Sequence, residues 1–199
     1  MKNIEESDNF MNVDRISTLI DGIFAIAMTI LILSIEVPII SGPVSNKIIE
    51  SSLNAIIFPF LSFFLSFILL AMFWTINHRN MQHIKRIDNV FLWINVVWLM
   101  FIVIVPFSSE LSGMYSNFIL PHLIFNLNML AIAILLYLSI YYADNKGLIS
   151  DTMENNKKKS IIRSSRFFIL IAMLAVVLSF ITPSGSGLIY LAVLFEKFF

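Results

Sequence analysis

The hydrophobic and polar positions of this chain fall into long blocks rather than into a residue-by-residue alternation. Apolar blocks separated by polar connections predict α-helices at about 16–37, 53–77, 90–105, 118–142, 161–181 and 188–199. A helix needs ~20 residues to cross a bilayer core of ~30 Å, so such blocks are typical of transmembrane spans. The last block, about 12 residues, crosses in part or is tilted and buried. The pattern predicts an all-α membrane protein with six transmembrane helices.

Prolines and turn residues separate these blocks. Three of the predicted helices run into a proline, where we expect each helix to stop, at Pro38, Pro106 and Pro183. Residues 39–52 carry turn signals, and we expect a loop or a short re-entrant piece there. Residues 107–117 are expected to form a second loop.

Composition supports a membrane protein and removes several classes of chemistry. Of the 199 residues, 58% are hydrophobic and 13% are charged, whereas a soluble domain has about one-quarter charged residues. The chain has no cysteine, three histidines, no HExxH motif and no glycine-rich phosphate loop. We therefore expect no enzyme activity, no cofactor or metal, and no nucleotide or nucleic-acid partner. Residues 15–199 are expected to form a single transmembrane domain behind a polar tail at 1–14.

The placement of positive charge predicts the orientation in the membrane. Of the 13 Lys and Arg residues, Lys47 is the only one that follows the first, third or fifth predicted helix. Positive residues favour the cytoplasmic side, so both termini are expected in the cytoplasm, at the plasma membrane, as an even number of spans requires. The lysine run 157–159, with Arg163 and Arg166, is most simply a topology signal that also touches anionic lipid.

An ionisable residue lies inside the first predicted span. Because an unpaired charge in hydrocarbon is expensive, Asp21 is a functional-site hypothesis. Arg15 lies six residues away, about 120° around the helix, so the two do not pair on one helix face. The expected partners of Asp21 are Trp74 and His78, four residues apart. The next candidates are Asn95 and Trp98, three residues apart. Two hypotheses stay open: a network that braces the helix, and a titrating Asp21–His78 pair that relays protons.

A branched apolar stripe occupies another face of the same helix. At 100° per residue, Ile26, Ile30 and Leu33 fall within about 60° of one another, and Asp21 lies roughly 140° from Ile26. Thr29 lies about 60° from the centre of this stripe and offers a hydroxyl at its edge. From the residues alone, such a stripe is ordinary lipid-facing or core packing.

Four further polar residues, in or near the predicted spans, have simple interpretations. Glu36 and Glu110 are expected near the outer helix ends, either as an outer vestibule that concentrates cations or as solvated helix-end carboxylates. Asn126 and Asn128 are expected to make hydrogen bonds between helices.

Several motifs together resemble one known family. The segments are Arg15-x3-Leu19-Ile20-Asp21-Gly22-x2-Ala25-Ile26-Ala27-x-Thr29, then Phe73-Trp74-x3-His78-Arg79, Leu92-Trp93-x-Asn95 and Val105-Pro106-Phe107. They resemble the signature of the prokaryotic members of the transmembrane protein 175 family of potassium channels. The family's usual motif is Arg-x3-Phe-Ser-Asp, and Leu19 and Ile20 replace its Phe and Ser here. The resemblance covers roughly residues 15–108.

This resemblance changes the reading of the apolar stripe. It implies a six-helix subunit, assembled as a homotetramer, in which the first helix lines a central pore and the protein acts as a leak-type potassium channel. It implies that Ile26, Ile30 and Leu33 form the constriction. It also implies an interhelical network of Arg15, Asp21, Trp74 and His78.

Two competing functions also fit a multi-pass protein. A proton-coupled secondary transporter or a proton-leak pathway would use Asp21 and His78 as its titrating pair. Transporters usually contain internal repeats and helices broken at the midplane, and the sequence displays neither. A non-conducting scaffold is the third reading, favoured only by the lack of a catalytic constellation.

Overall fold

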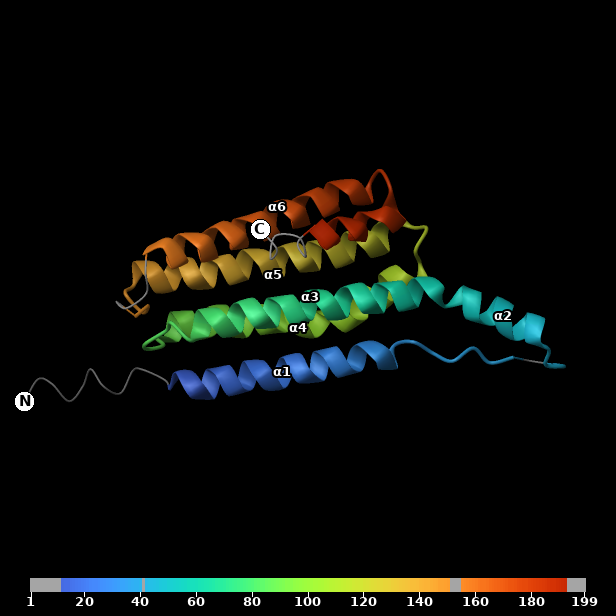
Figure 1. Cartoon of the computed structure of the whole chain (residues 1–199), viewed down its shortest axis with the longest axis horizontal. Helices are drawn as coiled ribbons and strands as arrows, with labels where there is room; N and C mark the ends of the chain where they lie inside the picture. Colours follow the sequence, from blue (N-terminus) through green and yellow to red (C-terminus); the bar gives the residue numbers. More distant parts are fainter. Residues whose placement is uncertain (1–11, 41, 151–154, 193–199) are drawn as a thin grey trace, which may run out of the picture.

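The computed structural model describes residues 12–40, 42–150 and 155–192. Its elements, in order, are α1 (Val13–Leu33), α2 (Asn46–Ala55), α3 (Ile57–Met81), α4 (Asn89–Met114), α5 (Ile119–Asn145), α6 (Asn155–Ser179) and a 3-10 helix, η1 (Pro183–Tyr190) (Figure 1). Among the described residues, five helices are long and apolar enough to cross a membrane: α1, α3, α4, α5 and the Lys158–Ser179 part of α6. The protein is therefore an all-α membrane protein.

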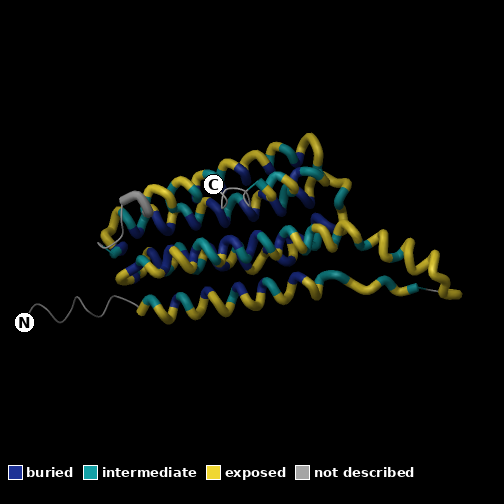
Figure 2. Tube along the Cα trace, viewed as in Figure 1, coloured by how far each residue is buried: buried dark blue, intermediate teal, exposed yellow. Residues whose placement is uncertain are grey.

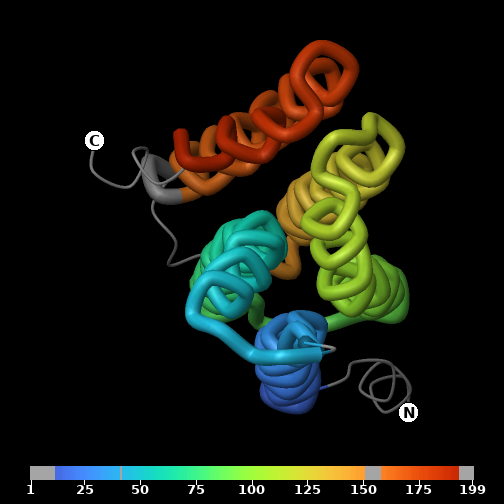
Figure 3. Tube along the Cα trace, turned by 90° about the vertical axis from the view of Figure 1, so that its right-hand side faces the viewer, coloured from blue at the N-terminus to red at the C-terminus, as the bar shows by residue number. Residues whose placement is uncertain are grey.

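The long helices pack as a bundle in which α1 and α6 are farthest apart. α1 packs against α3 and α4, α4 packs against α5, and α5 packs against α6 and η1. Figure 3 shows α1 and α6 on opposite sides of the bundle. The start of α1 and the α3–α4 and α5–α6 connections lie at one end, and α2 extends beyond the other (Figure 1).

α1 presents one face to the bundle. Its buried residues recur at spacings of three and four, as expected for one side of a helix: Ile16, Ile20, Phe24, Ala27 and Leu31. The Phe24 and Trp98 ring centroids lie 5.4 Å apart, and Trp98 Nε1 donates to the carbonyl of Ile132, 3.2 Å away. These contacts join α1, α4 and α5 through one buried indole.

The bounds of α1 differ from those predicted. The helix begins at Val13 because the Asn12 side chain caps it, accepting from the Asp14 amide at 2.9 Å. It ends at Leu33 rather than near 37, and the Ser34 hydroxyl donates to the carbonyl of Leu31 at 2.8 Å. A proline disfavours the helical conformation at the residue before it, so we expect a helix to end before Pro38 rather than to reach it.

The predicted helix 53–77 is in fact two helices. The loop expected at 39–52 is helical from Asn46 onward, with Ser45 as the N-cap of α2. The break before α3 falls at Ile56, three residues before Pro59. Proline cannot donate to the carbonyl four residues back and its ring crowds that carbonyl, which explains an interruption at this point. No residue of α2 is buried (Figure 2).

The expected stop of the third helix at Pro106 was wrong. α4 continues to Met114 with Pro106 inside it, so most of the expected loop 107–117 is helical. Hydroxyl groups act on nearby carbonyls: Ser108 Oγ donates to Val105 O at 3.1 Å. Pro106 has no N–H to donate to the carbonyl of Ile102, four residues back, and prolines are tolerated in membrane helices where neighbouring helices and local adjustments satisfy the backbone again.

The predicted sixth span, 188–199, is not confirmed. Residues 183–190 form the 3-10 helix η1, which packs against α5 and α6 and buries Tyr190. Residues 193–199 lie outside the described part of the chain. Two glycines, at 185 and 187, disfavour a regular α-helix at the start of this segment. The tail predicted at 1–14 also lies mostly outside the described residues, since 1–11 are not described.

The polar connections at the α1 N-terminal end are joined to each other. An antiparallel bridge pairs Ile84 with Ile149, and the Lys85 amide donates to the carbonyl of Leu148 at 2.8 Å. Asp88 caps α4 by accepting from the Phe91 amide at 2.8 Å, and its other oxygen accepts from the Tyr142 hydroxyl at 2.7 Å. The carboxylate therefore fixes the start of α4 against the end of α5.

Candidate functional site

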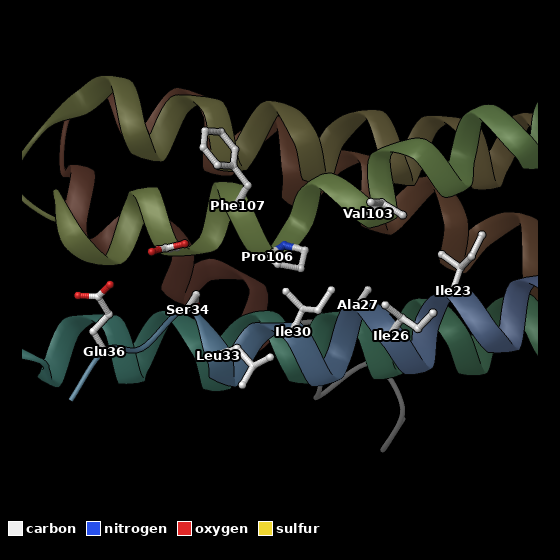
Figure 4. Close-up of a pocket in the computed structure, with 11 residues that line it drawn as sticks. Ile23, Ile26, Ala27, Ile30, Leu33, Ser34, Glu36, Val103, Pro106 and Phe107 are labelled. Atoms are coloured by element: carbon white, nitrogen blue, oxygen red, sulfur yellow. The ribbon is translucent and has the colours of Figure 1, made fainter.

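An elongated groove of about 530 Å³ lies between α1 and α4 (Figure 4). On the α1 side it is lined mainly by the apolar stripe: Ile26, Ile30 and Leu33 are 60%, 44% and 77% exposed. On the α4 side it is lined by residues at spacings of three and four, Val103, Pro106, Phe107 and Glu110. The stripe predicted from helical angles is therefore one continuous surface, and no residue that the structure describes covers it fully.

The groove changes character along its length. Around Ile26, Ala27 and Ile30 its side chains are hydrocarbon only. Glu36 lies beyond Leu33 at one end (Figure 4), and Glu110 also lines the groove. Glu36 is exposed and Glu110 is half-buried. The two carboxylates that were expected near the outer helix ends thus line one groove, whose middle is apolar and whose end is anionic.

Thr29 lies on the exposed side of α1 but does not line this groove. Its hydroxyl donates within its own helix, with Ala25 O at 3.0 Å and Ile26 O at 2.9 Å. The hydrogen of this hydroxyl is therefore committed to the backbone, and only its oxygen lone pairs remain for another partner.

Asp21 and Trp74 are brought together by the packing of α1 on α3. Trp74 Nε1 donates to Asp21 Oδ1 at 2.8 Å, and among the described residues Asp21 has no other hydrogen-bond partner. An indole can only donate, so it suits a carboxylate as a fixed partner. The contact supports the bracing hypothesis, because it ties α1 to α3 at a point about 140° from the groove-lining Ile26.

His78 lies next to Trp74 rather than against Asp21. Its ring stacks on the Trp74 indole, with centroids 5.5 Å apart and 25° between the planes. His78 Nε2 lies 3.2 Å from Nε2 of Gln82, one turn further along α3. The proposed titrating pair thus makes no direct hydrogen bond, and Trp74 contacts both of its members.

The other two members expected in the network lie elsewhere. Asn95 is buried, and its amide donates to Phe91 O at 2.8 Å and to Ser139 Oγ at 3.3 Å. It therefore joins α4 to α5. Arg15 is exposed and has no hydrogen bond or ion pair with any residue that the structure describes.

Sequence reasoning missed a group of serines between α3 and α4. The Ser62 hydroxyl donates to the carbonyl of Ser109 at 2.8 Å and lies 3.0 Å from Ser112 Oγ, and Ser66 Oγ donates to Ser109 Oγ at 2.7 Å. The helices approach closely here: a Cβ on Gly113 would lie 2.8 Å from Pro59 Cα. Serines four apart in one apolar block, and three apart just after another, are the signal that could have predicted this contact.

The described residues contain no group of three or more His, Asp or Glu side chains that could hold a metal ion. The charged side chains that line the groove are the carboxylates Glu36 and Glu110.

Comparisons with known proteins agree with the motifs and the geometry. Residues 15–106 match the model of the endosomal/lysosomal potassium channel TMEM175 family. The whole fold is similar to the crystal structure of a lysosomal potassium-selective channel TMEM175 homologue from Chamaesiphon minutus. The TM-score is 0.80 at 27% identity, over 94% of this chain and 96% of that one. Residues 15–106 are thus similar to the TMEM175 family, and the fold is similar to that of a solved TMEM175 homologue. The matched segment is the part, 15–108, on which the motif resemblance rested.

The curated relatives that this chain matches are bacterial proteins named as potassium channels. One from Chamaesiphon minutus is 36% identical over 106 residues, which are 51% of this chain and 49% of that protein. One from a Chryseobacterium species is 30% identical over 103 residues, 52% of this chain and 50% of that protein. The chain thus matches these relatives over about half of their length.

Proposed function

We propose that this protein is a homotetrameric, potassium-selective leak channel of the plasma membrane, with both termini in the cytoplasm. Four copies of α1 line a central pore. The observation that carries the proposal is the two-sided α1: one apolar face packs on α3 and α4, and the other, Ile26, Ile30 and Leu33, is open along a groove. The names of the relatives and of the solved neighbour support the choice of ion.

The constriction works through the cost of dehydration. Four copies of Ile26 would surround the axis with branched carbons that offer an ion nothing to bind. A bare ion in such a ring costs tens of kcal/mol by Born estimates, so conduction requires a ring wide enough for part of the hydration shell. A narrower ring dewets and closes. Potassium holds its water less tightly than sodium and passes more easily, which gives modest selectivity without a carbonyl filter.

The groups around the stripe support this role. The Trp74–Asp21 hydrogen bond holds α1 on α3 from the side away from the stripe. Glu36 and Glu110 provide negative charge at the end of the groove, where it concentrates cations ahead of the constriction. Arg15, Thr29 and Asn95 are not required by this account.

Recording from purified protein in planar bilayers tests the proposal. We expect ohmic unitary currents with potassium permeability above sodium permeability, and a tetrameric mass in detergent. Slow, saturable flux without unitary currents would favour a transporter. Proton flux lost in Asp21→Asn and His78→Gln alike would favour the relay. A stable monomer would leave α1 without a pore to line.

A further inference from the structure

Three cations line one exposed face at the amino-terminal half of α6. Lys159, Arg163 and Arg166 are spaced by four and three residues and fall within about 60° on the helix. All three are exposed. The neighbouring Lys158 differs, because it forms an ion pair with Asp144 of α5. No described carboxylate pairs with Arg163 or Arg166, so no residue that the structure describes neutralises their charge.

Arg166 is held in place by an aromatic residue of α5. Its guanidinium carbon lies 5.7 Å from the centroid of the Tyr137 ring, and Nη2 donates to the Tyr137 hydroxyl at 3.4 Å. Tyr137 in turn stacks on Tyr141, with ring centroids 5.9 Å apart. A cation over an aromatic face is stabilised and loses rotational freedom, so the guanidinium is oriented before any ligand arrives.

The cationic face runs directly into an apolar one. Continuing along the same side of α6, the exposed residues are hydrocarbon or thioether only: Leu170, Met173, Leu174 and Val177. Viewed down the helix axis, they fall within a sector of about 100°, and Lys159 and Arg163 lie in the same sector. The surface thus offers charge at one level and an apolar track along the helix axis, which is the layout of a phospholipid with its headgroup and acyl chain.

The position of this face agrees with a lipid partner. α6 lies across the bundle from α1, and its nearest neighbours are α5 and η1 (Figure 3). Arg166 lies within the apolar stretch that is long enough to span a membrane. An exposed guanidinium at that depth needs an anion, since an unpaired charge there is costly.

We propose that Lys159, Arg163 and Arg166, with Tyr137 orienting Arg166, bind the phosphate of an anionic phospholipid at the α5–α6 seam. The guanidinium of Arg166 presents paired N–H donors to the phosphate oxygens, and Arg163 and Lys159 add charge. One acyl chain follows Leu170, Leu174 and Val177. The site goes beyond the channel activity and does not depend on it.

Native mass spectrometry of the full chain in detergent tests this site. The probes are phosphatidylglycerol and phosphatidylcholine with matched acyl chains. We expect tight binding of the anionic lipid, weakened about fivefold by Arg166→Gln and again by Arg163→Gln, which corresponds to ~1 kcal/mol for each basic residue near a membrane surface. Lys146→Gln is the matched control, because Lys146 is also an exposed cation and lies at the carboxyl-terminal end of α5, the end nearer to Tyr137.

Two variants separate a built site from diffuse attraction. Tyr137→Leu removes no charge, and we expect it to weaken binding of phosphatidylglycerol about as much as Arg166→Gln, whereas Tyr137→Phe keeps the ring and most of the binding. If Tyr137→Leu fails to fold, Arg166→Lys takes its place as the test. It keeps the positive charge but loses the planar guanidinium, and we expect it to weaken binding of phosphatidylglycerol. Equal losses in Lys146→Gln and Arg166→Gln, with none in Tyr137→Leu or Arg166→Lys, would overturn the proposal. If millimolar inorganic phosphate displaced phosphatidylglycerol from the site, phosphate itself would be the ligand, and the assignment of a lipid would be overturned.

Discussion

α1 and α5 are similarly apolar, but α1 lies at the edge of the bundle and α5 lies between other helices. In their apolar stretches, 28% of the α1 residues and 50% of the α5 residues are buried. α5 is tied to its neighbours by buried polar groups: the Asn126 amide donates to Ser179 Oγ at 2.7 Å, and the Asn128 amide donates to Phe101 O at 3.2 Å. Within the described part of the chain, one side-chain hydrogen bond joins α1 to another helix, that from Trp74 to Asp21.

The difference indicates where each helix finds its partners. A central helix can satisfy buried amides inside its own chain, because neighbours surround it. A helix at the edge with one packed face has a second face that its own chain does not cover. In α1 that second face is the stripe along the groove. Of the two helices, α1 therefore has fewer side-chain hydrogen bonds to its own chain, and it is the helix whose proposed function depends on other copies of the protein.

The largest expected effect breaks the contact between the two regions. Trp98 is 1% exposed, packs on Phe24 of α1 and donates to Ile132 O of α5. We expect Trp98→Ala to lower the free energy of unfolding by about 3–5 kcal/mol, because it leaves a large cavity and an unpaired carbonyl. Unfolding in detergent monitored by circular dichroism measures this loss.

The control for this substitution lies on the same helix. Trp93 is 64% exposed, and Trp93→Ala should change the unfolding free energy by less than about 1 kcal/mol. A similar loss in both variants would mean that the buried indole is not what joins α1 to the central helices.

The second prediction separates function from stability on α1. Ile26→Asn should lower the preference for potassium over sodium toward a permeability ratio of about one, because a polar ring wets the constriction. Single-channel reversal potentials under bi-ionic conditions measure this ratio. Ile32 is 44% exposed, lies about 120° from Ile26 and does not line the groove, so Ile32→Asn is the control.

If Ile32→Asn lowered the ratio as much as Ile26→Asn, the ion path would not follow this stripe. An unchanged ratio in Ile26→Asn alone would remove Ile26 from the constriction and leave the rest of the channel proposal to Ile30 and Leu33.

The third prediction concerns the one side-chain hydrogen bond between α1 and α3. In a double-mutant cycle, Asp21→Ala and Trp74→Phe should show a coupling energy of about 1 kcal/mol, since each removes one partner of the same hydrogen bond. Asp21→Ala should also reduce the tetramer fraction in detergent, because α1 loses its orientation. Normal tetramers with an altered pH response would instead favour the proton relay.

Much of the fold, and part of the site, could be predicted from the sequence. The long apolar blocks predicted the bundle, because a membrane forces each span to satisfy its own backbone. The expected hydrogen bonds of Asn126 and Asn128 between helices are confirmed, as few other partners exist for an amide in hydrocarbon. The spacing of Ile26, Ile30 and Leu33 predicted a shared face because helix geometry fixes it.

The failures come from information that lies on other helices. α4 continues through Pro106 into a stretch that packs on α3, where the Ser109 hydroxyl donates to the carbonyl of Ser62, a residue distant in sequence. Asn95 donates to Ser139 rather than to Asp21. The position of a residue around its own helix can be predicted from the sequence, but that position does not identify which helix packs against it. Helix α2 was missed because its polar composition and turn signals resemble a loop.

The smallest expected effect tests the serines that hold α3 against α4. Ser66 is fully buried and donates one hydrogen bond, to Ser109 Oγ. Ser66→Ala should cost about 0.6 kcal/mol, the average for a hydrogen bond between membrane helices, because the unfolded state in detergent or lipid also finds partners for a hydroxyl. Ser51 on α2 is exposed, and Ser51→Ala should have no measurable effect on the same unfolding curve. A loss above about 2 kcal/mol for Ser66→Ala would mean that the α3–α4 serines act as one cooperative network, so that α1 packs on a pair of helices as firmly joined as α4 and α5.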